Sequence, residues 1–351
     1  MLKYKYYWVI IIIQMFLLVG LILYVLQTKL VLNETIITVA PIAKENIVYA
    51  TSSSLNNFYE FTPGVVHQTK PEWLGDYNLL NTINNDTLNE RFDYATITPI
   101  GTYRIVVLGD SWTYGQYTST KDNYTEQLED LLNAQVTCGD FSKFEVINLG
   151  IPNYDIAFAY ERFRIRGHKY NPDAVIWFMH QNDFNLINDY LMDTERTELE
   201  DLKQHASAEQ FGQYNPETGY KGMFVSDGTD MLRVEATVRA YDKMNAELSI
   251  EKILSYQSEY FKRFTNLFKK PTILYSPTKV FDYGAETLTT IRSFGDSAPN
   301  VTVYESPITL DRNLDLYPDF HPNPHGHGLI AKDLMGYLLV TELAQCNLKS
   351  E

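Results

Sequence analysis

The pattern of apolar and polar positions divides the chain into an apolar start, a polar stretch and an alternating remainder. Residues 6–26 are almost entirely apolar, and Gln14 is the only strongly polar side chain among them. As a helix this run would span roughly 30 Å, the thickness of the hydrocarbon core of a bilayer. From residue 103 onward, short β-branched runs alternate with amphipathic stretches, which is typical of a parallel sheet with helices on both faces.

The alternating part predicts specific strands and helices. Apolar runs bounded by Gly, Pro or Asp predict buried strands, and stretches with one apolar face predict helices. Strands are expected at 104–108, 144–149, 174–179, 271–277 and 300–304, and helices from Asp122 or Asn123 onward and at 155–167, 250–268 and 325–343. Together they predict a three-layer α/β/α sandwich with a flavodoxin-like parallel sheet.

Two polar stretches interrupt the pattern. Residues 29–102 are rich in Asn and Thr and are expected to form a stalk and an extension packed on the domain edge, with a β-strand or two and no chemistry. Residues 185–248 are charged, with a helix expected at 194–208, and we interpret them as an insertion at the carboxyl edge of the sheet. Such an insertion forms a lid, forms part of a substrate groove, or is a surface insertion with no role in the site. The domain itself is expected at 103–349.

The apolar start is interpreted as a membrane anchor formed by residues 1–28. Lys3 and Lys5 precede the run and Lys29 follows it, a distribution that favours a cytoplasmic N-terminus and an extracytoplasmic remainder. A cleaved signal peptide is the alternative, but the run is long for a signal and no small-x-small cleavage site follows it. We therefore expect a single-pass, uncleaved anchor.

Charge and cysteine content limit the classes of function that fit the chain. A net charge of −15 without a cluster of Lys and Arg argues against a nucleic-acid partner. Cys138 and Cys346 are the only two cysteines, and neither has the spacing of a metal or redox motif. An external compartment would permit a disulfide between them, and two buried free thiols are the alternative. No metal or organic cofactor is expected.

Polar motifs follow the predicted strands, at the edge where ligands bind in open α/β sheets. They are Gly109-Asp110-Ser111, Asn148-Leu149-Gly150, Gln181-Asn182-Asp183 and Asp319-Phe320-His321-Pro322-Asn323. In this order they resemble the SGNH (GDSL-type) hydrolase family, over roughly Gly101 to the C-terminus. Each motif alone is a weak signal, whereas the set in the family's order is a strong one.

The resemblance implies Ser111 as the nucleophile and His321 as its base, with His325 and His327 as nearby competitors for the base. The family's orienting aspartate stands three residues before the histidine, where this chain has Pro318. Asp319, two residues before His321, would share its face in an extended segment. Asp315 is the alternative, and a dyad without a carboxylate is a third possibility.

The oxyanion donors implied by the resemblance are a side-chain amide and backbone N–H groups. Asn182 supplies the amide, although the family's glycine two residues before it is His180 here. The second donor is the N–H of either Gly150 or Asn153, where asparagine would have to adopt the left-handed conformation. The third donor is the Ser111 N–H. Asp110 and Asp183 are expected to hold loops by accepting hydrogen bonds from backbone amides.

The expected activity is that of a membrane-anchored, extracytoplasmic serine esterase that forms an acyl-serine intermediate. The resemblance implies an ester of a glycan, a lipid or a small molecule as substrate, with an O-acetylated envelope glycan as one candidate. An O-acyltransferase acting on an envelope polysaccharide shares the same intermediate and is one alternative. A non-catalytic binding protein with the SGNH fold is another, favoured by the displaced aspartate and by the missing glycines at His180 and Asn153.

Overall fold

The structure is a computed structural model that describes residues 47–49, 53–64, 66–67, 72–205 and 228–349. The chain divides into two compact units, Met1–Pro41 and Ile42–Glu351, and the described residues all belong to the second. The predicted anchor at 1–28 lies outside the described residues. Within the described ranges, no helix is both long enough and apolar enough to cross a membrane.

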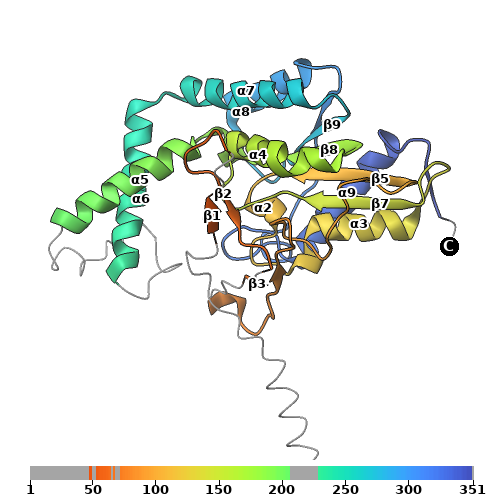
Figure 1. The fold of residues 1–351 in the computed structure, drawn as a ribbon, viewed down its shortest axis with the longest axis horizontal. Coiled ribbons are helices and arrows are strands. Elements are labelled where there is room, and N and C mark those ends of the chain that lie inside the picture. Colours follow the sequence, from red (N-terminus) through yellow and green to blue (C-terminus); the bar gives the residue numbers. More distant parts are fainter. Residues whose placement is uncertain (1–46, 50–52, 65, 68–71, 206–227, 350–351) are drawn as a thin grey trace, which may run out of the picture. The chain divides into compact units, whose positions relative to one another are not determined.

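A five-stranded parallel sheet forms the centre of the described unit (Figure 1). Counted along the chain its strands lie in the order 2-1-3-4-5, which is the flavodoxin-like order. The order reverses next to the first strand, and crevices at such reversals are where ligands bind in open α/β sheets. In spatial order the strands are β10 (Val301–Glu305), β9 (Thr272–Ser276), β8 (Ala174–Phe178), β5 (Thr102–Leu108) and β7 (Lys143–Asn148).

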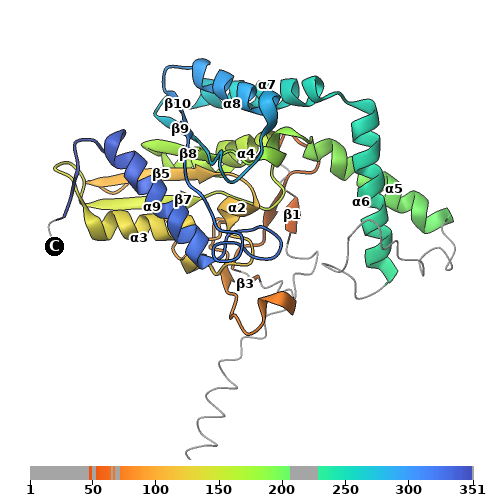
Figure 2. The same cartoon turned by 180° about the vertical axis from the view of Figure 1, so that it is seen from behind.

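Helices cover both faces of this sheet, which confirms the predicted α/β sandwich (Figures 1 and 2). Because side chains alternate along a strand, β5 contributes to two cores. Val106 and Leu108 pack into one core, and Ile105 and Val107 into the other. One face carries α3 (Tyr124–Gln135) and α9 (Pro324–Val340), and the other carries α4 (Ile156–Arg162), α7 (Ile250–Leu267) and α8 (Gly284–Asp296).

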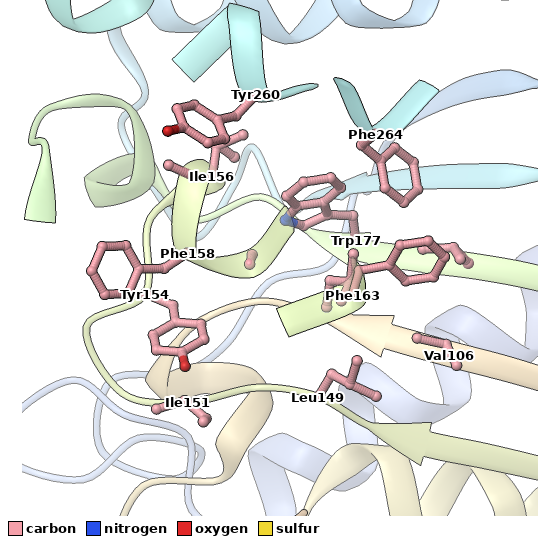
Figure 3. Packing of buried hydrophobic residues seen from close by; sticks show 14 of the residues in the cluster. Val106, Leu149, Ile151, Tyr154, Ile156, Phe158, Phe163, Trp177, Tyr260 and Phe264 are labelled. Carbon is pink, nitrogen blue, oxygen red and sulfur yellow. The ribbon is translucent and has the colours of Figure 1, made fainter. Parts of the chain in front are cut away.

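Aromatic rings fill the core beneath α4 and α7 (Figure 3). Trp177 of β8 is fully buried, and its ring meets Phe264 of α7 at a centroid distance of 5.0 Å. Phe163, which follows α4, also meets Phe264 at 5.0 Å. The same three rings therefore tie α7 and the end of α4 to the central strand β8, whose carboxyl end carries part of the polar motif set.

The structure differs from the sequence prediction mainly in the insertion and in the connections. Helix α5 (Asn188–His205) begins six residues before the predicted start at 194, and α6 (Gly228–Glu247) was not predicted. These two helices pack against each other, and Leu191, Ala240 and Met244 share a small core between them. Helix α8 was also not predicted, and residues 206–227 of the insertion, including the end of the predicted helix at 194–208, lie outside the described residues.

Short elements complete the described part of the chain. The predicted extension contains two small antiparallel pairs, and Cys138 forms a disulfide with Cys346 next to a third. The pairs are β1 (Ile47–Tyr49) with β2 (Tyr59–Phe61), β3 (Val66–His67) with β4 (Asn81–Thr82), and β6 (Val136–Thr137) with β11 (Asn347–Leu348). The short helices are η2 (Glu72–Leu74), α2 (Ser111–Tyr114), η3 (Thr120–Asp122), η4 (Phe163–Gly167), η5 (His168–Tyr170) and η6 (Gln181–Phe184).

Buried carboxyl groups attach the extension to the edge strand β7. Glu90 is fully buried and accepts hydrogen bonds from the Asn148 N–H and from the Tyr94 hydroxyl. Glu129 of α3 accepts from the Val146 N–H at 2.8 Å and from the same Tyr94 hydroxyl at 3.0 Å. Burial raises the pKa of Glu129 to about 7, so its proton is held more tightly in the folded chain.

Glu129→Gln is expected to flatten the dependence of stability on pH. A pKa raised on folding contributes stability that is complete below the unfolded value and is lost as the pH rises through about 7. Glutamine keeps an oxygen for the Val146 N–H but does not titrate. Thermal unfolding between pH 5 and 8.5 should therefore show the wild type losing on the order of 3 kcal/mol relative to the variant. Parallel curves for the two proteins would contradict this, and Asp130→Asn, exposed on the same helix, is the control.

Candidate active site

The turn after β5 presents Ser111 at the start of α2. Gly109 has φ +154°, and a Cβ at this position would lie 2.2 Å from the Thr113 hydroxyl oxygen, so only glycine fits. Asp110 caps α2 by accepting a hydrogen bond from the Trp112 N–H at 2.9 Å. This confirms the expectation that Asp110 holds the loop. The half-buried Ser111 is thereby fixed at the carboxyl edge of the sheet, beside the reversal in strand order.

His321 lies between Ser111 and Asp319. Its Nε2 is 2.8 Å from the Ser111 Oγ, and its Nδ1 is 2.8 Å from the Asp319 Oδ2. Since an ionised carboxylate only accepts hydrogen bonds, Asp319 favours the tautomer with the proton on Nδ1. The Nε2 lone pair is then free to accept the hydrogen bond of the Ser111 hydroxyl. The structure thus joins a nucleophile, a base and an orienting acid in one hydrogen-bonded line.

Asp319 reaches His321 through a tight turn. The prediction that these residues lie in an extended segment is therefore wrong. Phe320, between them, has φ +73°, the left-handed region that bulky residues rarely adopt. The Tyr317 N–H donates to the His321 carbonyl, and the Phe320 N–H donates to the Tyr317 carbonyl. Arg312 closes the turn from outside by donating to the carbonyls of Tyr317 and Pro318.

The other candidate acids and bases have different partners. Asp315 accepts from the Nδ1 of His325 at 2.6 Å, so these two residues pair with each other away from Ser111. His327 is fully buried, and its Nδ1 accepts a hydrogen bond from the Tyr124 N–H at 3.1 Å. Burial lowers the pKa of His327 to about 3, which leaves it neutral at physiological pH. Of the three histidines in this segment, His321 is the one with its ring nitrogen against the serine.

Of the two candidate backbone donors for the oxyanion, Gly150 is excluded by its hydrogen bonding. Its N–H donates to the Asn148 side-chain oxygen at 2.8 Å and is therefore occupied. The glycine is needed for packing instead, because a Cβ would lie 2.5 Å from the Tyr114 backbone nitrogen. Gly150 thus lets the loop after β7 approach the helix that carries Ser111.

Asn153 has the geometry that a backbone donor requires. It adopts φ +63°, and within the described residues its N–H has no acceptor. The Tyr59 hydroxyl donates to the Pro152 carbonyl, which belongs to the same peptide as the Asn153 N–H. Because the two groups of a trans peptide point in opposite directions, this bond fixes the direction of that N–H. The Asn188 side chain holds the next peptide by donating to the Asn153 carbonyl.

Asn182 lies in η6, directly beyond the carboxyl end of β8. Its side chain is exposed and makes no hydrogen bond within the described residues. His180 caps this helix, with its Nδ1 3.3 Å from the Asn182 N–H, and the Asp183 carboxylate accepts from the His180 N–H at 3.1 Å. Asp183 therefore holds its loop as expected. The Asn182 amide remains available to a bound group.

Asp110, His180 and Asp183 form the only candidate metal group in the described part of the chain. Their ligand atoms lie within 4.8 Å of one another, and all three side chains are buried. Burial and the neighbouring Asp110 raise the pKa of Asp183 well above its ordinary value, and burial lowers that of His180. Each side chain already accepts or shares a hydrogen bond with a backbone N–H, so we interpret the group as loop support.

Sequence reasoning missed two contributions from the extension, which was expected to carry no chemistry. Tyr59 orients the Asn153 N–H through the Pro152 carbonyl. Trp73 packs edge-on against Tyr117 at 5.1 Å, and Tyr117 in turn lies edge-on against the His321 ring at 5.7 Å. A single aromatic residue in a polar stretch gives no signal of such contacts, since they depend on tertiary packing.

Comparisons with known proteins give only distant structural matches. No protein-family model and no curated protein matches the chain. Among solved structures, TesA is 10% identical and aligns over 67% of this chain and 97% of its own, with a TM-score of 0.37. The esterase EstA from Pseudoalteromonas sp. is 13% identical and aligns over 69% of this chain and 98% of its own, with a TM-score of 0.40. A lipolytic G-D-S-L protein from Desulfitobacterium hafniense is 16% identical and aligns over 66% of this chain and 98% of its own, with a TM-score of 0.34. Nothing about this chain is concluded from likenesses this low.

The chain's own motifs converge on one site. The glycine-aspartate-serine turn after β5, the asparagine after β8 and the histidine loop before α9 meet at one edge of the sheet. There, Ser111, His321 and Asp319 form a continuous hydrogen-bonded line. The structure thus brings together the residues to which the resemblance to the SGNH (GDSL-type) family assigned the nucleophile, the base and the orienting acid.

Proposed function

We propose that the protein hydrolyses carboxylic esters through an acyl-serine intermediate. The observation that carries the proposal is the pair of 2.8 Å contacts that His321 makes with Ser111 and Asp319. A serine hydroxyl is a weak nucleophile unless a neighbouring base removes its proton. His321 is positioned and oriented to be that base, and Ser111 is accessible at the sheet edge.

In the first step, the Ser111 Oγ attacks the ester carbonyl while its proton passes to the His321 Nε2. Asp319 remains ionised and stabilises the imidazolium that forms. Negative charge develops on the carbonyl oxygen, and the Ser111 N–H, the Asn153 N–H and the Asn182 amide are the donors for it. Fixed donors of this kind stabilise the transition state because they need no reorganisation during the reaction.

In the second step, His321 returns the proton to the departing alcohol, and the acyl group stays on Ser111. Water then attacks the acyl carbon, giving up a proton to the His321 Nε2, and the carboxylic acid leaves as Ser111 recovers its proton. The non-catalytic alternative was favoured by the displaced aspartate. That argument loses its support, because Asp319 contacts the His321 ring from its displaced position.

The finer features of the proposal concern substrate and location. We infer a single-pass membrane anchor at residues 1–28, with the catalytic domain outside the cytoplasm, from the apolar run and the flanking lysines. The disulfide between Cys138 and Cys346 supports an oxidising compartment. Outside a membrane, an O-acetylated glycan is the substrate class that we propose, and an acceptor sugar in place of water would make the same site an acyltransferase.

Ser111→Ala and His321→Ala are each expected to lower kcat for p-nitrophenyl acetate by at least about a thousandfold, since both groups act in one chemical step. The full-length chain would be assayed in a detergent that contains neither an ester nor a sugar. His325→Ala is the matched control, because its exposed ring pairs with Asp315. Equal rates for the wild type and both site variants would overturn the proposal.

Asp319→Asn and Asp315→Asn distinguish the two candidate acids. Asparagine at 319 can donate a hydrogen bond to Nδ1 and so favours the tautomer whose Nε2 carries a proton. We expect this variant to lose roughly a thousandfold to ten-thousandfold in kcat. Asp315→Asn changes a carboxylate that contacts His325, and its kcat should stay within a few-fold of the wild type. The reverse ranking would show that the turn rearranges on substrate binding.

Asn182→Ala tests the side-chain oxyanion donor. Removal of one such donor typically lowers kcat by about a hundredfold or more, with little effect on KM. Asn185→Ala is the control, because Asn185 is an exposed asparagine three residues further along. A loss confined to KM would indicate that Asn182 binds the ground state, and Asn182 would then have no role as an oxyanion donor.

A further inference from the structure

Aromatic side chains from three separate segments gather beside the base. We propose that Trp73, Tyr317 and Phe320, with the buried Tyr117 behind them, form a subsite for the alcohol half of the ester, and that this subsite takes a pyranose ring. The inference rests on the proposed ester hydrolysis and specifies its substrate. Trp73 belongs to η2 of the extension, Tyr117 follows α2, and the other two residues lie in the loop before α9.

The rings form a continuous series that begins at His321. The Tyr117 ring stands edge-on to the His321 ring, with centroids 5.7 Å apart and planes at 83°. Trp73 meets Tyr117 at 5.1 Å and Tyr317 at 5.3 Å. Tyr317 lies in the loop before α9 that also carries His321, and its N–H donates to the His321 carbonyl at 2.8 Å. The extension and the loop before α9 are thus joined next to the base.

The chemistry of the reaction assigns this side to the alcohol. His321 protonates the leaving oxygen, so that oxygen must come within hydrogen-bond reach of Nε2. The carbonyl oxygen is directed instead toward the donors at Ser111, Asn153 and Asn182. The remainder of the alcohol therefore extends from the imidazole. The buried Tyr117 ring borders the imidazole, and the half-buried rings of Trp73 and Tyr317 continue this side toward solvent.

Phe320 is held in an exposed position despite backbone strain. It is 60% exposed, and its φ of +73° is a left-handed conformation that bulky residues rarely adopt. The Arg312 guanidinium covers one face of its ring at 3.8 Å and is itself bonded to the carbonyls of Tyr317 and Pro318. With one face covered and most of the side chain exposed, the other face is open to a ligand.

An open aromatic rim suits a sugar better than an alkyl chain. One face of a pyranose ring displays C–H bonds with a small positive charge, which are attracted to the negative faces of aromatic rings, while its hydroxyls stay in water. An alkyl chain gains free energy in proportion to the apolar area that it removes from water. The exposed Phe320 and the half-buried Trp73 and Tyr317 provide a rim and leave such a chain partly in water.

The test compares acetates that differ only in the alcohol. The substrates are methyl 6-O-acetyl-α-D-glucopyranoside, hexyl acetate and ethyl acetate, and ethyl acetate normalises for general damage to the catalytic residues. In Trp73→Ala and in Phe320→Gly, the ratio of kcat/KM for the sugar acetate to that for ethyl acetate should fall three- to tenfold, mainly through KM. Glycine at 320 removes the ring and also the strain, so its Tm should not fall.

Phe92→Ala is the matched control, because Phe92 is 49% exposed and also lies under an arginine, Arg91, at 5.1 Å. Its ratio should equal that of the wild type. A fall in the hexyl acetate ratio with no change for the sugar would overturn the proposal in favour of an alkyl alcohol. Unchanged ratios with active enzyme would overturn the subsite and leave ester hydrolysis standing.

A wild type that turns over none of the acetates would contradict the proposed function, and the subsite is then judged by binding. The Ser111→Ala chain should broaden the acetyl proton resonance of the sugar acetate, and a second substitution, Trp73→Ala, should abolish that broadening. Equal broadening in both variants would overturn the subsite independently of catalysis.

Discussion

The site depends on one imidazole ring held from both sides. The contact between His321 and Ser111 joins residues 210 positions apart, so it exists only because the sheet brings both loops to one edge. Ser111 is fixed by β5 and the short helix α2, whereas His321 is fixed by the loop that enters α9. Because α9 packs against α3 over the same face, the core that stabilises the fold also sets the distance between nucleophile and base.

The extension before β5 belongs to the catalytic unit. Glu90 is buried against the Asn148 N–H at the carboxyl end of β7, and Tyr59 anchors the Pro152 carbonyl in the loop that follows. Both contacts act on the segment that carries Asn153. A buried carboxyl group needs hydrogen-bond partners to offset its desolvation, so these bonds fix the extension in one position. Trp73 of the same extension packs against Tyr117, whose ring in turn meets His321.

The strands were predictable because each is a short apolar run between turn residues, and the parallel sheet with helices on both faces follows from their alternation. Helix α6 was not predicted, because it is charged along most of its length and lacks a clear apolar face. The choice between Gly150 and Asn153 depends on where the Asn148 side chain points, and no sequence pattern carries that information. Asp319 was chosen because residues two apart share a face in an extended segment. That reason is wrong, since Phe320 between Asp319 and His321 has a left-handed conformation.

His180 shows how a departure from a family pattern is accommodated. A histidine in place of the glycine brings a ring into the space behind the nucleophile, where it packs edge-on against Phe281 at 4.4 Å and lies 6.0 Å from Trp112. Burial lowers the pKa of His180, so the ring adds no charge near the developing oxyanion. Its Nδ1 lies 3.3 Å from the Asn182 nitrogen and 3.3 Å from an Asp110 carboxylate oxygen, and in the neutral ring it forms a hydrogen bond with one of them at a time. The side chain that replaces the glycine therefore links the loop of the nucleophile to the loop of the amide donor, a connection that glycine could not make.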